Sequence, residues 1–143
     1  MDVTDPARLL ALQWGWRVPR QQLAKLLLAY PNLSTALADD PANWSEQGVS
    51  RQAMSKLQAL NSAASRRQLE HDSDRWQEKL IVWHSKGIQP LLLGSSDFPQ
   101  QLAEIPDPPV LLFFRGDSDL FRHPLIAIVG SRRASEYGKR CTR

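Results

Sequence analysis

The chain has 143 residues, of which 42% are hydrophobic, and carries a formal net charge of +3. Its apolar runs are too short to cross a bilayer, and the acidic start lacks the basic and apolar regions of a signal peptide. Cys141 is the single cysteine, which excludes an internal disulfide. We therefore expect a globular, cytoplasmic protein without a membrane span.

The first half of the chain predicts a bundle of helices. Helices are expected to open at Thr4 or Asp5 and at Pro19, with a short third helix over residues 32–37 and another after Ser50. In these segments leucines and other apolar residues recur three or four positions apart, which gives each helix one apolar face. We interpret residues 1–66 as one helical bundle.

A glycine turn precedes the last of these helices. Gly48, Val49 and Ser50 follow the order of a glycine, a small apolar residue and a helix cap, which is the outline of a helix-hairpin-helix or a sterile-alpha-motif-like bundle. Such hairpin glycines present backbone N–H groups to DNA phosphates. A lone glycine is more often a simple turn, so we interpret the bundle as a docking or scaffolding domain. The segment 39–41, Asp-Asp-Pro, is expected to be a turn.

Residues 67–87 are predicted to form a helix that bridges two parts of the chain and ends at Gly87. All the tryptophans lie in this helical half, several on apolar stripes, so packing in the core is favoured over a platform for stacked bases. They are Trp14, Trp16, Trp44, Trp76 and Trp83.

The remaining residues, 88–143, are predicted to open an α/β domain. Apolar runs indicate strands over 88–93, 110–114 and 125–129, with a short helix over 98–105. The last run is apolar throughout, which is typical of a parallel-type strand buried on both faces.

Gly130, Ser131 and Arg132 follow that last strand. A glycine allows close backbone approach, and a hydroxyl, backbone N–H groups and a guanidinium at the carboxyl end of a strand suit phosphate binding. From Arg122 onward there are six basic residues and one acidic residue, a net charge of +5, whereas the rest of the chain carries −2. This placement of charge predicts a polyanionic ligand.

Catalytic constellations are scarce. His71, His84 and His123 are far apart in the sequence and lack cysteines or carboxylates at metal-ligand spacing. Ser131 has no evident histidine base. The glycine pattern is neither a dinucleotide fingerprint nor a P-loop. We therefore expect no metal, no cofactor and no enzymatic activity.

Two motifs in the second half carry a family resemblance. Residues 98–116 read FPxxLxxIxDPPxxLFxxG and residues 126–138 read IAIVGSRxxSxYG, and their order closely resembles the DNA-processing protein A family, also called Smf. The resemblance covers the chain from about Ile88 onward and implies a Rossmann-like domain that binds single-stranded DNA and loads the RecA recombinase during natural transformation. The DNA-binding residues it implies, with the basic residues beside them, are Gly130, Ser131, Arg132, Ser135, Tyr137, Gly138, Lys139 and Arg140.

The expected fold class is thus α/β, a helical bundle followed by the truncated start of a Rossmann-like domain. The family's later SGxAxGID segment is missing, so we expect an amino-terminal fragment of limited activity. One alternative is a nucleotide-phosphate enzyme of the lysine-decarboxylase-like phosphoribohydrolase group, whose PGGxGT segment is also missing. Another is a helical module that binds a protein partner. A homodimer is left open.

Overall fold

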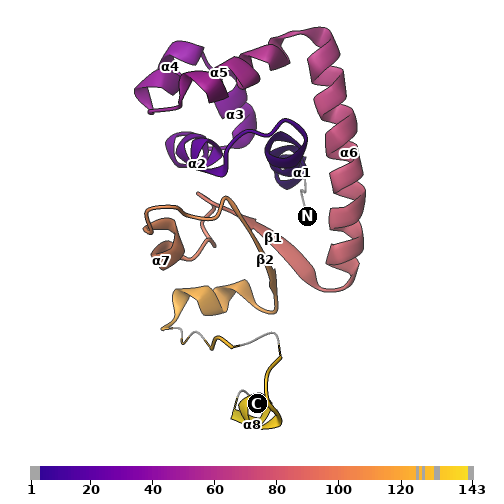
Figure 1. Cartoon of the computed structure of the whole chain (residues 1–143), viewed down its shortest axis with the longest axis vertical. Coiled ribbons are helices and arrows are strands. Elements are labelled where there is room, and N and C mark those ends of the chain that lie inside the picture. The colour runs from indigo at the N-terminus through magenta and orange to yellow at the C-terminus, as the bar shows by residue number, and fades with distance from the viewer. Residues whose placement is uncertain (1–3, 125, 127, 131–132, 142–143) are drawn as a thin grey trace.

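The computed structural model describes residues 4–124, 126, 128–130 and 133–141. Helices make up most of the fold, together with one antiparallel pair of strands (Figure 1). The elements are α1 (Thr4–Leu10), the π-helical turn η1 (Ala11–Gly15), α2 (Arg20–Ala29), α3 (Leu33–Ala38), α4 (Pro41–Glu46), α5 (Arg51–Gln58), the 3₁₀ turn η2 (Ala59–Asn61), α6 (Ala63–Ser85), β1 (Ile88–Leu92), α7 (Gln100–Ala103), β2 (Leu111–Arg115), the 3₁₀ turn η3 (Ser118–Arg122) and α8 (Glu136–Cys141).

Side-chain caps explain where several helices begin. The Asn32 side chain accepts a hydrogen bond from the Thr35 N–H at 2.8 Å and starts α3. The Ser50 hydroxyl accepts from the Ala53 N–H at 3.3 Å and starts α5. Each cap satisfies a backbone donor that the first helical turn leaves without a partner. The helices predicted from these two residues are confirmed.

Helix α4 lies where a turn alone was expected. The Asp40 carboxylate accepts from the Ala42 N–H at 2.8 Å, and Pro41 occupies the first helical position. An Asp-Pro pair signals a turn, but it is also the usual cap and first residue of a helix. Trp44 anchors this short helix because its side chain is buried.

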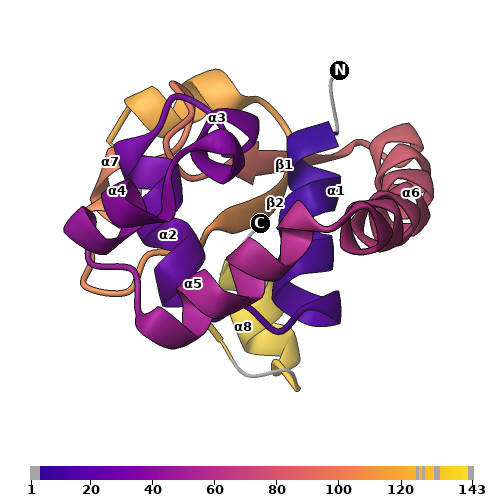
Figure 2. The same cartoon turned by 90° about the horizontal axis from the view of Figure 1, so that it is seen from above.

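Helix α6 runs along the outside of the molecule and joins α5 to β1. In both views α1 lies between α2 and α6 (Figure 1, Figure 2). Ser62 caps α6, so the helix includes most of the predicted bridging segment and starts a few residues before it. Gly87 follows with a φ of 75°, and its N–H donates to the His84 carbonyl at 2.8 Å. This is the expected glycine C-terminus.

The two strands form an antiparallel hairpin in which Ile88 pairs with Arg115 and Leu92 with Leu111. The strand predictions for these segments are confirmed, and α7 lies within the predicted 98–105 helix. The two strands are joined through α7 and the proline-rich segment that follows it.

The third predicted strand, over 125–129, is wrong for the residues that the structure describes there. Ile126, Ile128 and Val129 lie outside any strand, and their exposed fractions are 91%, 66% and 90%. An apolar run becomes a strand only where neighbouring strands pair with it and another layer covers it. The described sheet consists of β1 and β2, so a Rossmann-like sheet is not confirmed.

One continuous core joins the helices to the hairpin. Its residues come from α1 to α6, from β1 and from the segments flanking α7, and include Leu9, Leu12, Leu23, Leu26, Leu57, Leu91, Leu93, Phe98 and Val110. The division of the chain into units of residues 1–66, 67–87 and 88–143 therefore stays a prediction. In the structure, the three ranges contribute to one hydrophobic core.

Gly94, in the segment after β1, lies close to the backbone of α2. Its φ is 87°, and a Cβ on it would lie 2.7 Å from the Leu27 carbonyl oxygen of α2. Both facts require glycine at this position.

A tyrosine fixes the end of α2 to the loop before α4. The Tyr30 hydroxyl donates a hydrogen bond to the Asp39 carboxylate at 2.5 Å. This hydrogen bond, with burial and the Asp39 charge, raises the pKa of Tyr30 to about 12, and it is the first cause of a lowered pKa at Asp39. At neutral pH Tyr30 is therefore protonated and Asp39 ionised, which are the states that form this hydrogen bond.

The tryptophans follow the predicted packing with one exception. Trp44 is 2% exposed, and Trp16, Trp76 and Trp83 pack in part against the core clusters. Trp14 is 65% exposed, so its predicted place in the core is wrong. It lies two residues after buried Leu12, about half a helical turn away from the apolar stripe. No helix in the described part of the chain is long and apolar enough to span a membrane.

Candidate nucleic-acid interface

Ser135, one of the residues expected to bind phosphate, directly precedes helix α8. The Ser135 hydroxyl accepts a hydrogen bond from the Gly138 N–H at 3.1 Å, and its carbonyl accepts from the Lys139 N–H at 3.0 Å. Ser135 is therefore a helix cap in this structure. The structure brings Ser135, Gly138 and Lys139 together in one helical turn.

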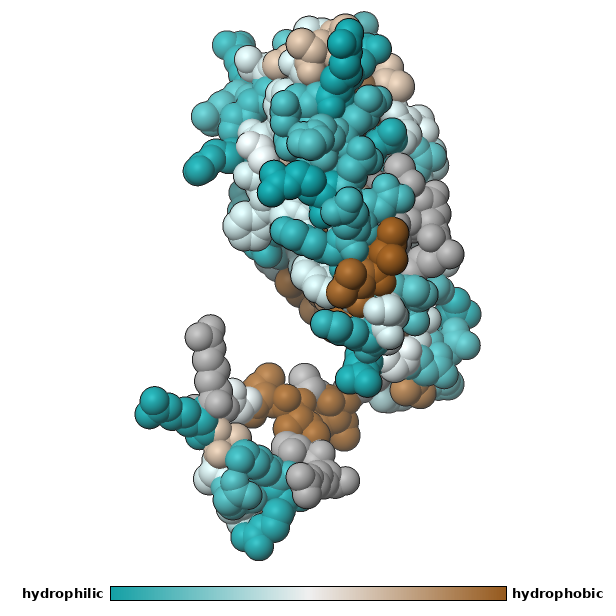
Figure 3. Space-filling model, turned by 90° about the vertical axis from the view of Figure 1, so that its right-hand side faces the viewer, coloured by the Kyte–Doolittle hydropathy of each residue, from teal (hydrophilic) through white to brown (hydrophobic). Residues whose placement is uncertain are grey.

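The side chains of α8 face solvent. Tyr137 is 72% exposed. The Lys139 ammonium pairs with the Glu136 carboxylate at 2.6 Å, and both side chains are more than half exposed. Arg140 is also exposed. Figure 3 shows α8 as a hydrophilic unit connected to the body by an apolar stretch.

The glycine turn before α8 is described in part. Ser131 and Arg132 lie outside the described residues. Gly130 is exposed, and a Cβ placed on it would meet no protein atom within 4 Å, its chain neighbours apart. Nothing in the described part of the protein therefore requires glycine there, and a requirement for close approach would come from a ligand.

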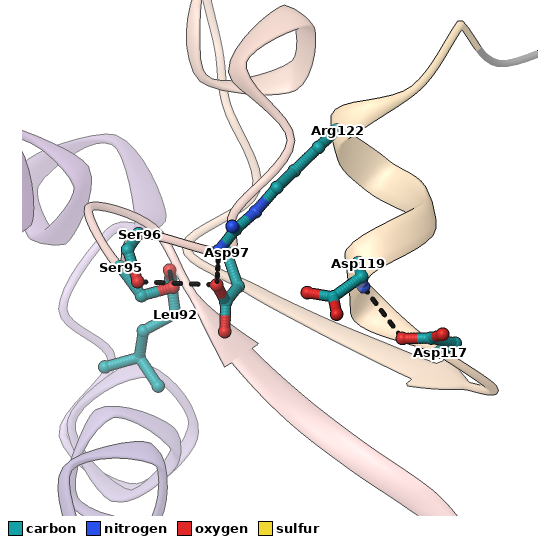
Figure 4. A network of polar contacts seen from close by, with 7 residues as sticks. All are labelled: Leu92, Ser95, Ser96, Asp97, Asp117, Asp119 and Arg122. Atoms are coloured by element: carbon teal, nitrogen blue, oxygen red, sulfur yellow. Dashed lines mark hydrogen bonds and ion pairs between the residues drawn. The ribbon is translucent and has the colours of Figure 1, made fainter.

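An ion pair ties the start of the basic segment to the body. The Arg122 guanidinium in η3 donates to the Asp97 carboxylate at 2.9 Å, and the Ser96 hydroxyl lies 3.4 Å from the same oxygen (Figure 4). Asp117 caps η3 by accepting from the Asp119 N–H at 2.9 Å. Arg122, one of the six basic residues counted in the sequence, is therefore paired with the body of the fold.

Comparison with known proteins covers this part of the chain. Residues 89–143 match the model of a family described as DNA recombination-mediator protein A. This segment is similar to the DNA-processing protein A family. The family match includes the hairpin, the proline-rich segment, η3 and α8.

Two curated relatives of the DNA-processing protein A family are similar to this chain. "DNA processing protein DprA" of Streptococcus pneumoniae is 51% identical over 41 residues, which is 29% of this chain and 14% of the relative. "DNA processing protein DprA" of Bacillus subtilis is 32% identical over 81 residues, 56% of this chain and 27% of the relative. The matched segments thus span about a quarter of these relatives or less. No solved structure matches the chain.

An ion pair connects the Asp-Pro-Pro segment of the family motif to the helical half of the chain. The Asp107 carboxylate pairs with the Arg20 guanidinium at the start of α2. An aspartate in such a turn commonly accepts backbone hydrogen bonds. Pro108 and Pro109 follow it and have no N–H to donate, and the arginine is the partner that the structure gives. Sequence reasoning missed this pair because 87 positions separate the two residues.

The Gly48 turn does not offer its backbone amides to a ligand. The Gly48 N–H donates to the Ser45 carbonyl at 2.9 Å, the Val49 N–H to the Trp44 carbonyl at 3.0 Å, and the Ser50 N–H to the Gln22 side chain at 2.7 Å. A helix-hairpin-helix contact to phosphate needs such groups free. The turn therefore acts as a structural link between α4 and α5, as the simpler interpretation had it.

Proposed function

We propose that the chain binds single-stranded DNA through the basic segment from Gly130 to Cys141, as part of a recombination mediator that loads RecA in natural transformation. The family match over residues 89–143 carries this proposal, because it ends on this segment and concerns DNA recombination. Tyr137 and Arg140 are both exposed, which supports the proposal. The tyrosine ring can stack on a base, and the arginine supplies a positive charge. The proposed mechanism is binding without bond cleavage.

Phosphate contact is assigned to Gly130, Ser131 and Arg132, with Ser135, Tyr137 and Gly138 as the residues that shape the following helix. Lys139 and Arg140 add long-range attraction that salt screens. The DNA backbone would lie against these basic residues, and the bases would remain accessible to a recombinase. A homodimer and a cytoplasmic location remain predictions alongside this function.

Substitution of Arg132 by alanine tests the proposal. We expect Arg132→Ala to weaken binding to every single-stranded sequence alike by about 1–3 kcal/mol, because a charge-assisted hydrogen bond to phosphate is lost. The slope of log affinity against log salt should fall by about 0.7, the share of one phosphate contact on a single strand. Fluorescence anisotropy of labelled oligonucleotides at several salt concentrations measures both quantities.

Arg133→Ala is the matched control and should have the smaller effect, since a neighbouring cation contributes mainly screened attraction. If Arg132→Ala changes neither the affinity nor the salt slope, the glycine turn is structural and the proposal fails. Turnover of a small phosphate ester that is lost in Arg132→Ala would instead support the nucleotide-cleaving alternative.

A further inference from the structure

The structure exposes a tryptophan on a helical turn of unusual geometry. In the π-helical turn η1, Ala11 and Leu12 are fully buried, whereas Trp14 is 65% exposed. Single π-helical turns occur frequently at functional sites. Trp14 thus presents a large aromatic side chain to solvent.

A shallow hollow of about 200 Å³ lies beside Trp14. Its apolar wall includes Leu10, Pro109 and Phe113, and Gln13 and Arg20 also line it. Phe113 is 44% exposed and rests edge-to-face on Trp83, with ring centroids 5.0 Å apart. Two aromatic side chains, one from η1 and one from β2, therefore line one hollow with polar groups around them.

The surrounding sequence is free of acidic residues. Residues 6–38 contain no Asp or Glu and include Arg8, Arg17, Arg20 and Lys25. Residues 47–69 likewise contain none and include Arg51, Lys56, Arg66 and Arg67. The Lys56 ammonium donates to the Arg17 carbonyl at 2.5 Å, which brings these two basic stretches together beside η1.

The acidic groups near this surface come from other elements. Asp107 pairs with Arg20, and Asp72 of α6 approaches Gly15, where a Cβ would lie 3.4 Å from its carboxylate oxygen. Arg17 is exposed. The surface that includes Trp14 and Arg17 therefore suits a ligand with flat rings and negative charge.

Arg17 also has a strained backbone. Its φ is 53°, and among the described residues no other non-glycine has a positive φ. The left-handed conformation is strained for any residue that carries a Cβ. The Val18 N–H donates to the Leu12 carbonyl at 3.0 Å, which with the Lys56 contact holds the turn in place. Strain of this kind gathers at functional sites, where it fixes the direction of a side chain.

We propose that Trp14 and Arg17 form a second contact for single-stranded DNA, in which a base stacks on the Trp14 indole and a neighbouring phosphate lies against the Arg17 guanidinium. The contact is separate from the α8 segment and rests on different observations. Single-stranded DNA is favoured over an apolar peptide because residues 6–38 and 47–69 carry basic and no acidic side chains.

Anisotropy titration of the full chain with fluorescein-labelled oligothymidylate at low salt tests this contact. Trp14→Ala should weaken binding between about fivefold and a hundredfold, the share of one stacked base, and leave the salt slope unchanged. Trp14→Phe should keep most of the affinity. Arg17→Ala should weaken binding and lower the slope by about 0.7, because a phosphate contact is lost.

Ile81→Ala is the matched control, since Ile81 is an exposed apolar residue on α6. It should stay within twofold of the native affinity. A Trp14→Ala protein that keeps its circular dichroism and binds within twofold of native overturns this inference, as does a native chain with no binding at low salt.

The two proposed DNA contacts can be separated by the same titrations. Loss of affinity in Trp14→Ala with none in Arg132→Ala supports this contact and removes the α8 proposal. The converse pattern removes this contact and leaves the α8 proposal standing. A Trp14→Ala effect on capture of an apolar peptide, without an effect on oligonucleotide, would assign the hollow to a protein partner.

Discussion

Trp44→Ala is expected to lower the free energy of unfolding by about 3–5 kcal/mol, the usual cost of removing a buried tryptophan side chain. Trp44 is 2% exposed, and its indole N–H donates to the Ala36 carbonyl at 2.8 Å. The substitution therefore leaves a cavity between α3 and α4 and also a buried carbonyl without its donor. Urea unfolding followed by circular dichroism measures the change.

Trp14→Ala provides the matched control, because it is the same substitution at a position that is 65% exposed. Its effect on stability should be within about 1 kcal/mol of zero, as for most surface positions. Equal losses in the two variants would contradict the burial of Trp44 and would mean that α4 does not contribute to the core. The control also establishes that Trp14→Ala is folded for the titrations described above.

Gly94→Ala is expected to destabilise the fold by about 2–5 kcal/mol, the sum of a left-handed backbone at a non-glycine residue and a steric clash in a packed region. Its φ is 87°, and the added Cβ would lie 2.7 Å from the Leu27 carbonyl oxygen. Since this oxygen belongs to the backbone of α2, the clash cannot be relieved by a side-chain rotation. The midpoint of urea unfolding should fall accordingly.

Gly87→Ala isolates the backbone term. Gly87 has a φ of 75°, and a Cβ there would make ordinary contacts, the nearest at 3.6 Å from Arg115. The cost should be about 1–2 kcal/mol, from the conformation alone. If Gly94→Ala costs no more than Gly87→Ala, the segment after β1 moves away from α2 without penalty, and the helices and the hairpin are less tightly joined than the shared core indicates.

The sequence predicted the elements whose limits depend on local chemistry. Asn32 and Ser50 cap helices through their own side chains, and Gly87 ends α6 through its backbone freedom. These signals act over a few residues, so they can be read without knowing the rest of the fold. Helix α4 was not predicted because its six residues show too little periodicity, and its Asp-Pro start also signals a turn.

The two candidate sites also differ in whether the sequence alone predicted them. The basic segment around α8 was readable from clustered charge and from the family motif. The surface at Trp14 was not, because the hollow beside it is lined by residues of η1 and of the segment 109–113, which lie far apart in the sequence. The Arg20–Asp107 pair and the Lys56 contact to Arg17 join distant parts of the chain, so they depend on the tertiary structure. The 125–129 run was misread because its pattern says nothing about which partners are present to cover it.

The left-handed backbone of Arg17 lowers the stability of the fold, whereas its side chain is proposed to bind DNA. Glycine adopts a φ of 53° without the Cβ penalty, so Arg17→Gly should gain about 1 kcal/mol of stability. A laboratory screen for heat-resistant variants would therefore enrich this change. A screen for retention on immobilised single strands would remove it, because the Arg17 guanidinium that is proposed to contact phosphate is gone. Opposite enrichment of one variant in two such screens would show that this turn keeps its arginine for binding.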